Sequence, residues 1–282
     1  MVWKWENNMD NKELETLANQ LRFTAVDMVY RAKDGHPGPA LSIADIMTVL
    51  YFDEMRLDPK NPDWEDRDRF ILSKGHACPI WYACLSERGY FGEKVDDFHL
   101  RALHSAFQGH PTMQKTRGVD MTSGSLGNGI AVGCGFAIAA KYRKKDYRTF
   151  VVVGDGELQE GVCWEGINTA SAHKLDNLFV FADRNGWQSG GAVVDTIGNN
   201  NLEDRFLAFG FDVQTINGHL IGEIKDAIAK AKTVKGKPHA IICDCIKGKG
   251  VSYMENNNAW HKGVPSGEQY AAAKKELLGG EE

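Results

Sequence analysis

An aspartate stands between two glycines at the end of an apolar run. The stretch "RTFVVVGDGELQEG" places Asp155 between Gly154 and Gly156. It lacks the spacing of a dinucleotide loop, and no Gly-Lys-Ser/Thr of a Walker loop follows. Glycine turns after strands often cradle phosphate, which a carboxylate would repel unless a cation lay between them. Because Mg²⁺ binds carboxylates together with phosphate oxygens, the turn predicts a metal–diphosphate site. The alternative is a plain strand–turn connection with a solvated aspartate.

The next apolar run supplies a second oxygen ligand. "NLFVFADRNGWQ" ends with Asp183 and Asn185, one predicted helix and one predicted strand after Asp155. Consecutive elements are usually neighbours, so we expect the two loops to meet at one edge of the sheet. The Asn185 amide oxygen, the Asp155 carboxylate and the backbone carbonyl of Trp187 then form a three-ligand set. Diphosphate and water complete an octahedron around Mg²⁺, and Mn²⁺ or Ca²⁺ fits the same oxygen ligands.

Four histidines lie in segments rich in glycine, proline or asparagine: "DGHPG", "SKGHA", "QGHP" and "NNNAWHKG". They are His36, His76, His110 and His261. Imidazole titrates near neutrality and can donate or accept a proton, which suits proton transfer at a carbonyl and the binding of hydroxyls. Each histidine alone is also compatible with a satisfied loop residue. The other histidines are interpreted as structural or surface groups: His99, His104, His173, His219 and His239.

Helical and strand patterns alternate along the chain. Apolar spacing predicts helices over 12–33, 41–55, 75–90, 126–143, 163–174, 201–210 and 221–232. Apolar runs predict strands over 69–73, 149–153, 177–183, 211–217 and 239–246, with 149–153 at the centre. Strands that are apolar throughout and separated by helices favour an α/β fold: a parallel sheet with helices on both faces. Ligands of such sheets bind beyond the carboxyl ends of the strands. The Gly/Ala-rich helix 126–143 predicts close packing against another backbone.

Length and composition set the class of protein. We expect the 282 residues to form a single α/β domain over 1–282. A formal net charge of −5 argues against a nucleic-acid or anionic membrane partner. The first residues, "MVWKWENNMDNKELE", lack the apolar region of a signal peptide, and no run reaches the ~18 apolar residues of a membrane span. Six scattered cysteines favour buried, reduced thiols, so we expect a cytoplasmic protein.

The motifs taken together resemble one enzyme family. "DGHPGPALSIADIMTVLY", "RDRFILSKGHACPIWYACLSERGY", "QGHP", "GVDMTSGSLGNGI", "GDGELQEG" and "KGKGVSYMENNNAWHKG" resemble transketolase and occur in the transketolase order. The resemblance covers about residues 12–265, with short tails at both ends. It extends only to the first domain of that family, the thiamine-diphosphate-binding domain of the diphosphate (PP) type.

The resemblance assigns a role to each candidate residue. It implies that the metal ligands are Asp155, Asn185 and the carbonyl of Trp187. It implies that the cofactor contacts are His76, Gly124, Ser125, Leu126, Gly156, Glu157 and His261, with 124–126 lying under the cofactor rings. It implies that the catalytic set is His36, His110, His261 and Glu160, where Glu160 is the acid that meets a partner subunit's glutamate.

The resemblance also implies an activity and a partner. Transketolases use thiamine diphosphate and Mg²⁺ to transfer a two-carbon ketol unit from a ketose phosphate to an aldose phosphate. The glutamate that activates the cofactor lies in a second domain of the family, and this sequence ends before it. We therefore expect an N-terminal subunit that is inactive alone. A separate subunit with the pyrimidine-binding and C-terminal domains would complete it in an α2β2 heterotetramer. Glu160 and the helix 126–143 are candidates for the contact, with ordinary helix packing as the alternative for both.

One segment departs from the family pattern, and it bears on the substrate. In "NGWQSGG", Trp187 stands where an aliphatic residue is common and Gly190 where an acid is common. We hypothesise that the indole favours a sugar other than the standard pentose phosphates. Two other classes remain open: half of another thiamine enzyme (like a deoxyxylulose-phosphate synthase or an oxo-acid dehydrogenase) and a non-catalytic cofactor-binding subunit. The histidine set favours transketolase over both.

Overall fold

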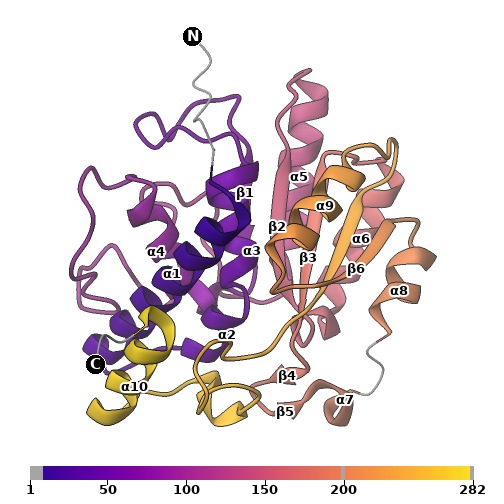
Figure 1. Cartoon of the computed structure of the whole chain (residues 1–282). Coiled ribbons are helices and arrows are strands. Elements are labelled where there is room, and N and C mark those ends of the chain that lie inside the picture. Colours follow the sequence, from indigo (N-terminus) through magenta and orange to yellow (C-terminus); the bar gives the residue numbers. More distant parts are fainter. Residues whose placement is uncertain (1–8, 198–200, 280–282) are drawn as a thin grey trace.

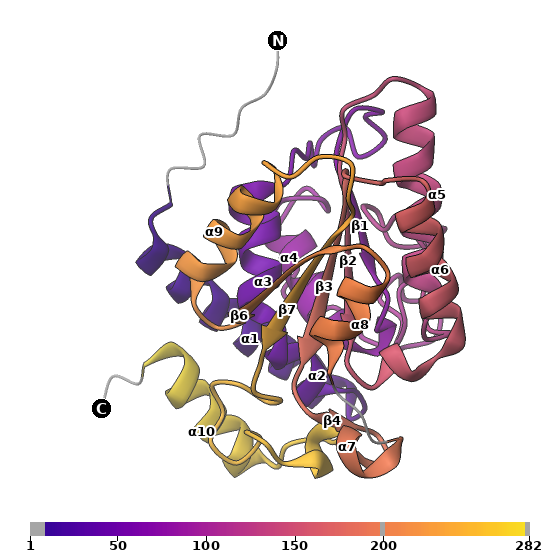
Figure 2. The ribbon, with the colours of Figure 1, turned by 90° about the vertical axis from the view of Figure 1, so that its right-hand side faces the viewer.

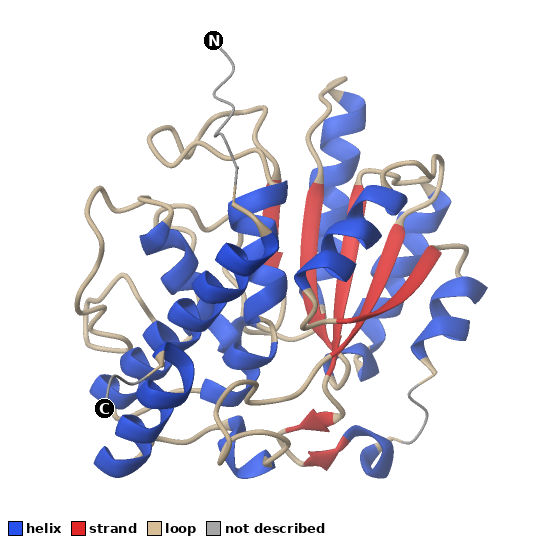
Figure 3. Ribbon diagram, viewed as in Figure 1, coloured by secondary structure: helices blue, strands red, loops and turns tan. Residues whose placement is uncertain are grey.

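The structure, a computed structural model, describes residues 9–197 and 201–279. In this part of the chain, five parallel strands form one sheet in the order β1-β2-β3-β7-β6 (Figure 1). Their bounds are β1 Arg69–Leu72, β2 Thr149–Gly154, β3 Leu178–Arg184, β6 Asp212–Asn217 and β7 His239–Asp244. A separate antiparallel hairpin pairs β4 Trp187–Gln188 with β5 Gly191–Ala192. In Figure 3 this hairpin lies beyond the end of the main sheet at which the strands finish.

Helices connect and cover these strands. The α-helices are α1 Asn11–Ala32, α2 Pro37–Ser42, α3 Ala44–Val49, α4 Cys78–Glu87, α5 Asn128–Tyr142, α6 Gly161–Ala172, α7 Val193–Thr196, α8 Leu202–Ala208, α9 Ile221–Ala231 and α10 Gly267–Leu278. Other helical turns are η1 Leu50–Glu54, η2 Gly75–Ala77, η3 Glu157–Gln159 and η4 Asn258–His261. A reciprocal capping box between Asp10 and Glu13 starts α1, because each side chain accepts from the other's backbone N–H.

The two faces of the sheet bury two separate cores, because successive strand residues point to opposite sides. In β2, Phe150 and Val152 pack into the core formed with α1, α3, α4 and α9. Val151 and Val153 pack into the core formed with α5, α6 and α8. Figure 2 shows these two groups of helices on opposite sides of the sheet. The expected α/β fold, with a parallel sheet covered on both faces, is confirmed.

Two details differ from the sequence-based expectation. The predicted central strand, 149–153, is second from an edge, and β3 occupies the centre. The last strand, β7, is almost wholly buried and pairs with β3 on one side and with the more exposed β6 on the other. Because two strands therefore lie beyond β3, β3 is the central strand. The predicted helix 41–55 begins earlier, at Pro37, and breaks at Ile43. Beside the break, the Ser42 hydroxyl donates to Asp183 at 2.6 Å, a tertiary contact that helical periodicity does not reveal.

The close packing predicted for the Gly/Ala-rich helix is confirmed for α5. A Cβ added to Gly133 would lie 2.7 Å from Val151 of β2, and one added to Gly166 of α6 would lie 3.0 Å from the Ala131 nitrogen. A side chain at Gly133 would force Val151 to shift, and one at Gly166 would make an unusually tight contact with the backbone of α5. Gly135, by contrast, has no atom within 4 Å of such a Cβ, so one side of α5 is uncovered in this chain.

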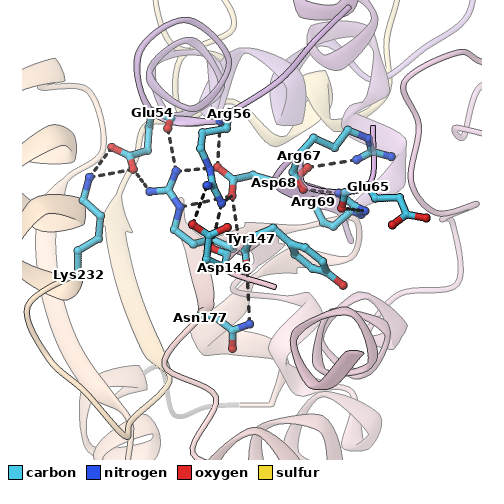
Figure 4. Close-up of polar contacts among 11 residues, drawn as sticks. Glu54, Arg56, Glu65, Arg67, Asp68, Arg69, Asp146, Tyr147, Asn177 and Lys232 are labelled. Atoms are coloured by element: carbon cyan, nitrogen blue, oxygen red, sulfur yellow. Dashed lines mark hydrogen bonds and ion pairs between the residues drawn. The ribbon is translucent and has the colours of Figure 1, made fainter. Parts of the chain in front are cut away.

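A network of charges (Figure 4) lies at the amino ends of β1 and β2. This is the end of the sheet opposite to the hairpin of β4 and β5 (Figure 1). The Asp68 carboxylate is fully buried and accepts from the Arg148 guanidinium at 2.6 Å and from the Arg148 and Arg56 backbone amides at 2.8 and 2.9 Å. Arg148 also contacts Glu54, which Lys232 reaches at 2.9 Å. This network joins the residues that precede β1 and β2 to the residue that follows α9, at the end of the sheet away from the candidate site.

Two further features concern the cysteines and the helices. Cys78, Cys84, Cys134, Cys163 and Cys243 are buried, and Cys245 is half-buried. In residues 9–197 and 201–279, no helix combines the length and the apolarity needed to cross a membrane. Residues 1–8, where the segment predicted to lack a signal peptide begins, lie outside the described residues.

Candidate active site

Loops at the carboxyl ends of β1, β2, β3 and β7 surround a cavity of about 630 Å³. The hairpin residue Trp187, Ile197 after α7 and His261 of η4 also line it. Every site residue predicted from the sequence lines this cavity except Ser125, which is exposed and accepts a hydrogen bond from Asn128 at 3.0 Å. The lining residues so predicted are His36, His76, His110, Gly124, Leu126, Asp155, Gly156, Glu157, Glu160, Asn185, Trp187 and His261.

Asp155 is buried in the cavity wall between two backbone donors. Its carboxylate accepts from the Gly156 amide at 2.8 Å and from the Gly186 amide at 2.6 Å. Burial, followed by the charge of the nearby Asp183, raises the pKa of Asp155 to about 6. A bound cation would offset both effects, because it stabilises the ionised carboxylate. The two loops therefore meet as the sequence predicted, and the carboxylate is oriented for a positive ligand.

Asn185 is oriented by its neighbours in the loop after β3. Its amide nitrogen donates to Asp183 at 2.7 Å, and its amide oxygen accepts from the Trp187 amide at 3.0 Å. A carbonyl oxygen has two lone pairs, so one remains for a metal ion. Burial raises the pKa of Asp183, but the contact with Lys74 and further hydrogen bonds outweigh burial and hold that pKa below its usual value.

Glu157 contacts the protein on several sides. Its carboxylate accepts from the Ser73 hydroxyl at 2.5 Å, the Gly127 amide at 2.7 Å and the Gly154 amide at 3.1 Å. Burial raises the pKa of Glu157 in spite of these donors. The carboxylate thus ties the glycine turn to the segment that begins α5, and a cofactor contact by Glu157 stays a prediction.

The four predicted histidines share the cavity. The rings of His36, His76 and His261 lie 5.2–5.6 Å apart, and the His110 ring packs against Gly124. Burial is the first cause that lowers the pKa of each: to about 4 for His36, to about 3 for His261, and well below the usual value for His76. The same cause lowers the pKa of His110. At neutral pH these imidazoles are uncharged, so each can donate one hydrogen bond and accept another.

Lys247 is a site residue that the sequence analysis missed. It follows β7, is fully buried, and donates from its ammonium to Asn258 at 2.8 Å and to His261 at 2.9 Å. Burial, with a smaller effect of the Lys74 charge, lowers the pKa of Lys247 to about 8. A buried ammonium that faces neutral groups in a cavity wall suits an anionic ligand. The available signal was the segment "KGKG" at a strand end, which is where ligands bind in this fold.

Arg101 and Lys262 form a second basic group that was missed. Both contact Asp34, at 2.9 and 3.3 Å, and both are close enough to His36 that their charges lower its pKa. The backbone of Arg101 is left-handed, with φ 62°, a conformation that residues other than glycine rarely adopt.

The residues fit thiamine diphosphate with a divalent cation. In the described part of the chain, the buried Nδ1 atom of His36 and the buried Oε1 atom of Gln188 have no hydrogen-bond partner. Buried polar atoms are usually satisfied, so these two atoms indicate a polar ligand. In residues 9–197 and 201–279, no group of three or more His, Cys, Asp or Glu side chains is arranged to hold a metal ion by itself. The mixed set of Asp155, the Asn185 amide and a backbone carbonyl stays the predicted ligand set for a cation.

Comparison with known proteins decides the family. The sequence matches the family described as transketolase, thiamine diphosphate binding domain, over residues 14–282. The chain belongs to this transketolase family. It is 40% identical to an apulose-4-phosphate transketolase subunit of Phocaeicola vulgatus, covering 95% of each chain. It is 38% identical to a 6-deoxy-6-sulfo-D-fructose transketolase subunit of a Clostridium species, covering 94% of this chain and 96% of that one.

Solved structures of transketolases share this architecture. The crystal structure of transketolase from Campylobacter jejuni superposes with a TM-score of 0.89 at 38% identity. That match covers 95% of this chain but only 43% of the Campylobacter chain. This chain thus corresponds to one part of a single-chain transketolase and to nearly the whole of the relatives named as subunits.

Proposed function

We propose that this chain is the diphosphate-binding subunit of a two-subunit transketolase. It would transfer a two-carbon ketol unit from a ketose phosphate to an aldose phosphate. The observation that carries the proposal is the convergence of four uncharged imidazoles with the Asp155–Asn185 oxygen pair in one cavity. Proton transfer at a sugar carbonyl and binding of sugar hydroxyls require such donors and acceptors.

The chain's own residues would hold the cofactor as follows. Asp155, Asn185 and the Trp187 carbonyl would bind Mg²⁺, and Lys247, His76 and Gly156 would contact the diphosphate. When bound, thiamine diphosphate supplies the carbanion chemistry of ketol transfer. The Asp155 carboxylate and the Lys247 ammonium are fixed by hydrogen bonds before any ligand arrives, so little ordering is needed on binding.

The imidazoles would serve the substrate. Because their pKa values are low, His36 and His261 would be uncharged donors and acceptors over the physiological range. The unpaired Nδ1 of His36 is a free position for a substrate hydroxyl or for a proton in transit. Arg101 and Lys262 add positive charge beside His36, which suits a phosphorylated or sulfonated sugar.

A partner protein would complete the site. Glu160, Leu126 and Ile197 line the cavity and are exposed in this chain. An acid with two apolar side chains at a cavity mouth suits burial by a second protein. The Phocaeicola relative, which is named as a subunit and has a matching length, supports the same arrangement. We propose that the pyrimidine-binding domain of a separate chain covers this mouth, in an α2β2 assembly to which the uncovered side of α5 contributes.

A ketol-transfer assay tests the proposal. This chain is assayed with thiamine diphosphate and Mg²⁺, alone and mixed with a candidate second subunit, against several ketose phosphates and a sulfonated ketose. Activity only in the mixture is the expected result, and sedimentation of the mixture gives the stoichiometry. Activity of the chain alone would overturn the need for a partner. Turnover of pyruvate in the mixture would instead assign the chain to another class of thiamine enzyme.

A further inference from the structure

A line of buried hydrogen bonds leads from α1 to the loop that carries Lys247. The Arg22 guanidinium contacts the Asp45 carboxylate, and both side chains are buried. The same carboxylate oxygen lies 2.8 Å from Nδ1 of His219, in the connection between β6 and α9. On the other side of the ring, Nε2 of His219 lies 2.8 Å from the backbone nitrogen of Ile246. His219 therefore bridges a buried ion pair and the residue before Lys247.

The two contacts determine the protonation of the ring. The Ile246 backbone N–H can only donate, so Nε2 of His219 must accept and carry no hydrogen. The hydrogen of the neutral imidazole is then on Nδ1, where the Asp45 carboxylate accepts it. Asp45 in turn keeps its charge, because burial alone would raise its pKa but Arg22 and His219 outweigh burial and lower it.

The amides on both sides of Lys247 are held. The ladder between β3 and β7 continues to Cys245, whose N–H donates to the Arg184 carbonyl at 3.1 Å. The next amide, that of Ile246, leaves the ladder and binds His219. The Gly248 amide donates to the Gly38 carbonyl at 3.1 Å. Lys247 thus projects into the cavity wall from a backbone fixed at the residue before it and the residue after it.

We propose that His219 is a positioning residue: oriented by Asp45, its imidazole holds the Ile246 amide and so places the Lys247 ammonium at the wall of the anion-binding cavity. His219 itself does not line that cavity; it lines a different one with Asn217, Leu220 and Lys249. It therefore acts through Lys247. The assignment of the anion as a cofactor diphosphate rests on the proposed function, whereas the positioning of Lys247 does not.

Two substitutions separate the two contacts of the ring. His219→Asn keeps a donor near Asp45 but removes the acceptor for the Ile246 amide. His219→Gln is the matched control, because its longer side chain can bring an amide oxygen close to the former Nε2 position. The groups that act on the Lys247 charge from the other elements, Lys74, Asp155, Asp183 and His261, are unchanged in both variants.

The readout is the titration of Lys247 in this chain. NMR of the lysine ε-methylene group monitors the titration, and the signal missing from Lys247→Met assigns the resonance of Lys247. We expect a pKa of about 8 in the native protein and in His219→Gln. In His219→Asn, a released loop would admit water to the ammonium, and the pKa would move up towards the usual lysine value. An unshifted Lys247 in a folded His219→Asn protein would overturn the proposal.

Binding of inorganic pyrophosphate with Mg²⁺, measured by calorimetry, gives the second readout. We expect the pyrophosphate affinity to fall about tenfold in His219→Asn, the effect of losing a residue that orients a binding group. The affinity should be unchanged in His219→Gln. If the native chain binds no pyrophosphate, the proposed function fails, and the Lys247 titration still decides the role of His219.

The native protein offers a test without any variant. Nitrogen-15 NMR of the His219 ring should show hydrogen on Nδ1 and none on Nε2 at neutral pH. The opposite tautomer would overturn the proposal even if His219→Asn fails to fold, because Nε2 could not then accept from Ile246.

Discussion

The backbone N–H of Gly186 donates to the Asp155 carboxylate at 2.6 Å, which joins the loop after β3 to the loop after β2. A second N–H, that of Gly156, fixes the other carboxylate oxygen. The carboxylate is therefore held in place although burial and the nearby charge of Asp183 raise its pKa to about 6. A positive partner would therefore stabilise the ionised form of this carboxylate.

Asp155→Asn should weaken metal-dependent cofactor binding. The substitution removes the only full charge among the proposed metal ligands, so thiamine diphosphate affinity in the presence of Mg²⁺ should fall by about 100-fold, the upper range for loss of a partner group at a metal site. Calorimetry with and without a chelator measures this. Asp195→Asn, an exposed aspartate of α7, is the control and should bind as the native chain does. Equal Mg²⁺ dependence in both variants would exclude Asp155 as a ligand.

The affinity for inorganic pyrophosphate should fall as the pH rises above about 8. Lys247 carries its positive charge only below its pKa, which burial lowers to about 8, so attraction for an anion is lost above that value. Lys247→Met should bind more weakly at pH 7 and show little further loss between pH 7 and pH 9. A native profile that stays flat over this range would show that the Lys247 charge does not contribute.

Much of this fold could be predicted because its strands are apolar throughout. Runs such as 149–153 and 177–183 identify buried parallel strands, and the residues after them therefore identify the ligand-binding edge. The position of each strand in the sheet could not be predicted, because it depends on how β7 returns to pair with β3. The break between α2 and α3 was missed for a related reason: the Ser42–Asp183 contact joins positions 141 residues apart.

The candidate site was predicted to a similar extent. Residues with a distinctive local signal, such as Asp155 and the histidines beside glycine, line the cavity as expected. The sequence around Lys247 and His219 indicates a functional role less strongly, because a lysine or histidine in a polar loop is ordinarily solvated. Their importance depends on burial and on partners from other elements, such as Asp45 and Asn258, which only the tertiary structure provides.

Acid should destabilise the protein through the buried imidazoles. Burial holds the pKa of His76 well below 6.5 in the folded protein, so below pH 6.5 the unfolded chain binds more protons and stability falls with decreasing pH. His76→Gln removes this contribution, and its free energy of unfolding in urea should fall less than that of the native protein between pH 7 and pH 5. The difference cannot exceed about 1.4 kcal/mol per pH unit for one proton. Parallel pH profiles would contradict the prediction.

Asp68→Asn should destabilise the fold while sparing the site. Asp68 is fully buried against Arg148 at the amino ends of the strands, so the substitution leaves a largely buried guanidinium with one charged partner fewer. Removing one partner of a buried pair costs about 3–5 kcal/mol, which urea unfolding can measure. Asp146→Asn, in the same network but exposed, should cost less than about 1 kcal/mol. Pyrophosphate binding by the folded protein should be unchanged in both variants, because the network lies at the opposite edge of the sheet.

Trp187→Leu should change the choice of ketose without weakening the metal site. Only the backbone carbonyl of Trp187 is proposed to bind the metal, and the Trp187 amide that orients Asn185 at 3.0 Å is also kept. The partly exposed indole lines the cavity, so shortening it alters the space beside the sugar. Relative kcat/KM values for a panel of phosphorylated and sulfonated ketoses, measured with the partner present, should move by about tenfold between donors, the effect of a modest change in a pocket wall. Magnesium-dependent binding of thiamine diphosphate is the control and should stay within about twofold, which corresponds to ~0.4 kcal/mol. An unchanged donor order with intact cofactor binding would show that Trp187 does not select the substrate.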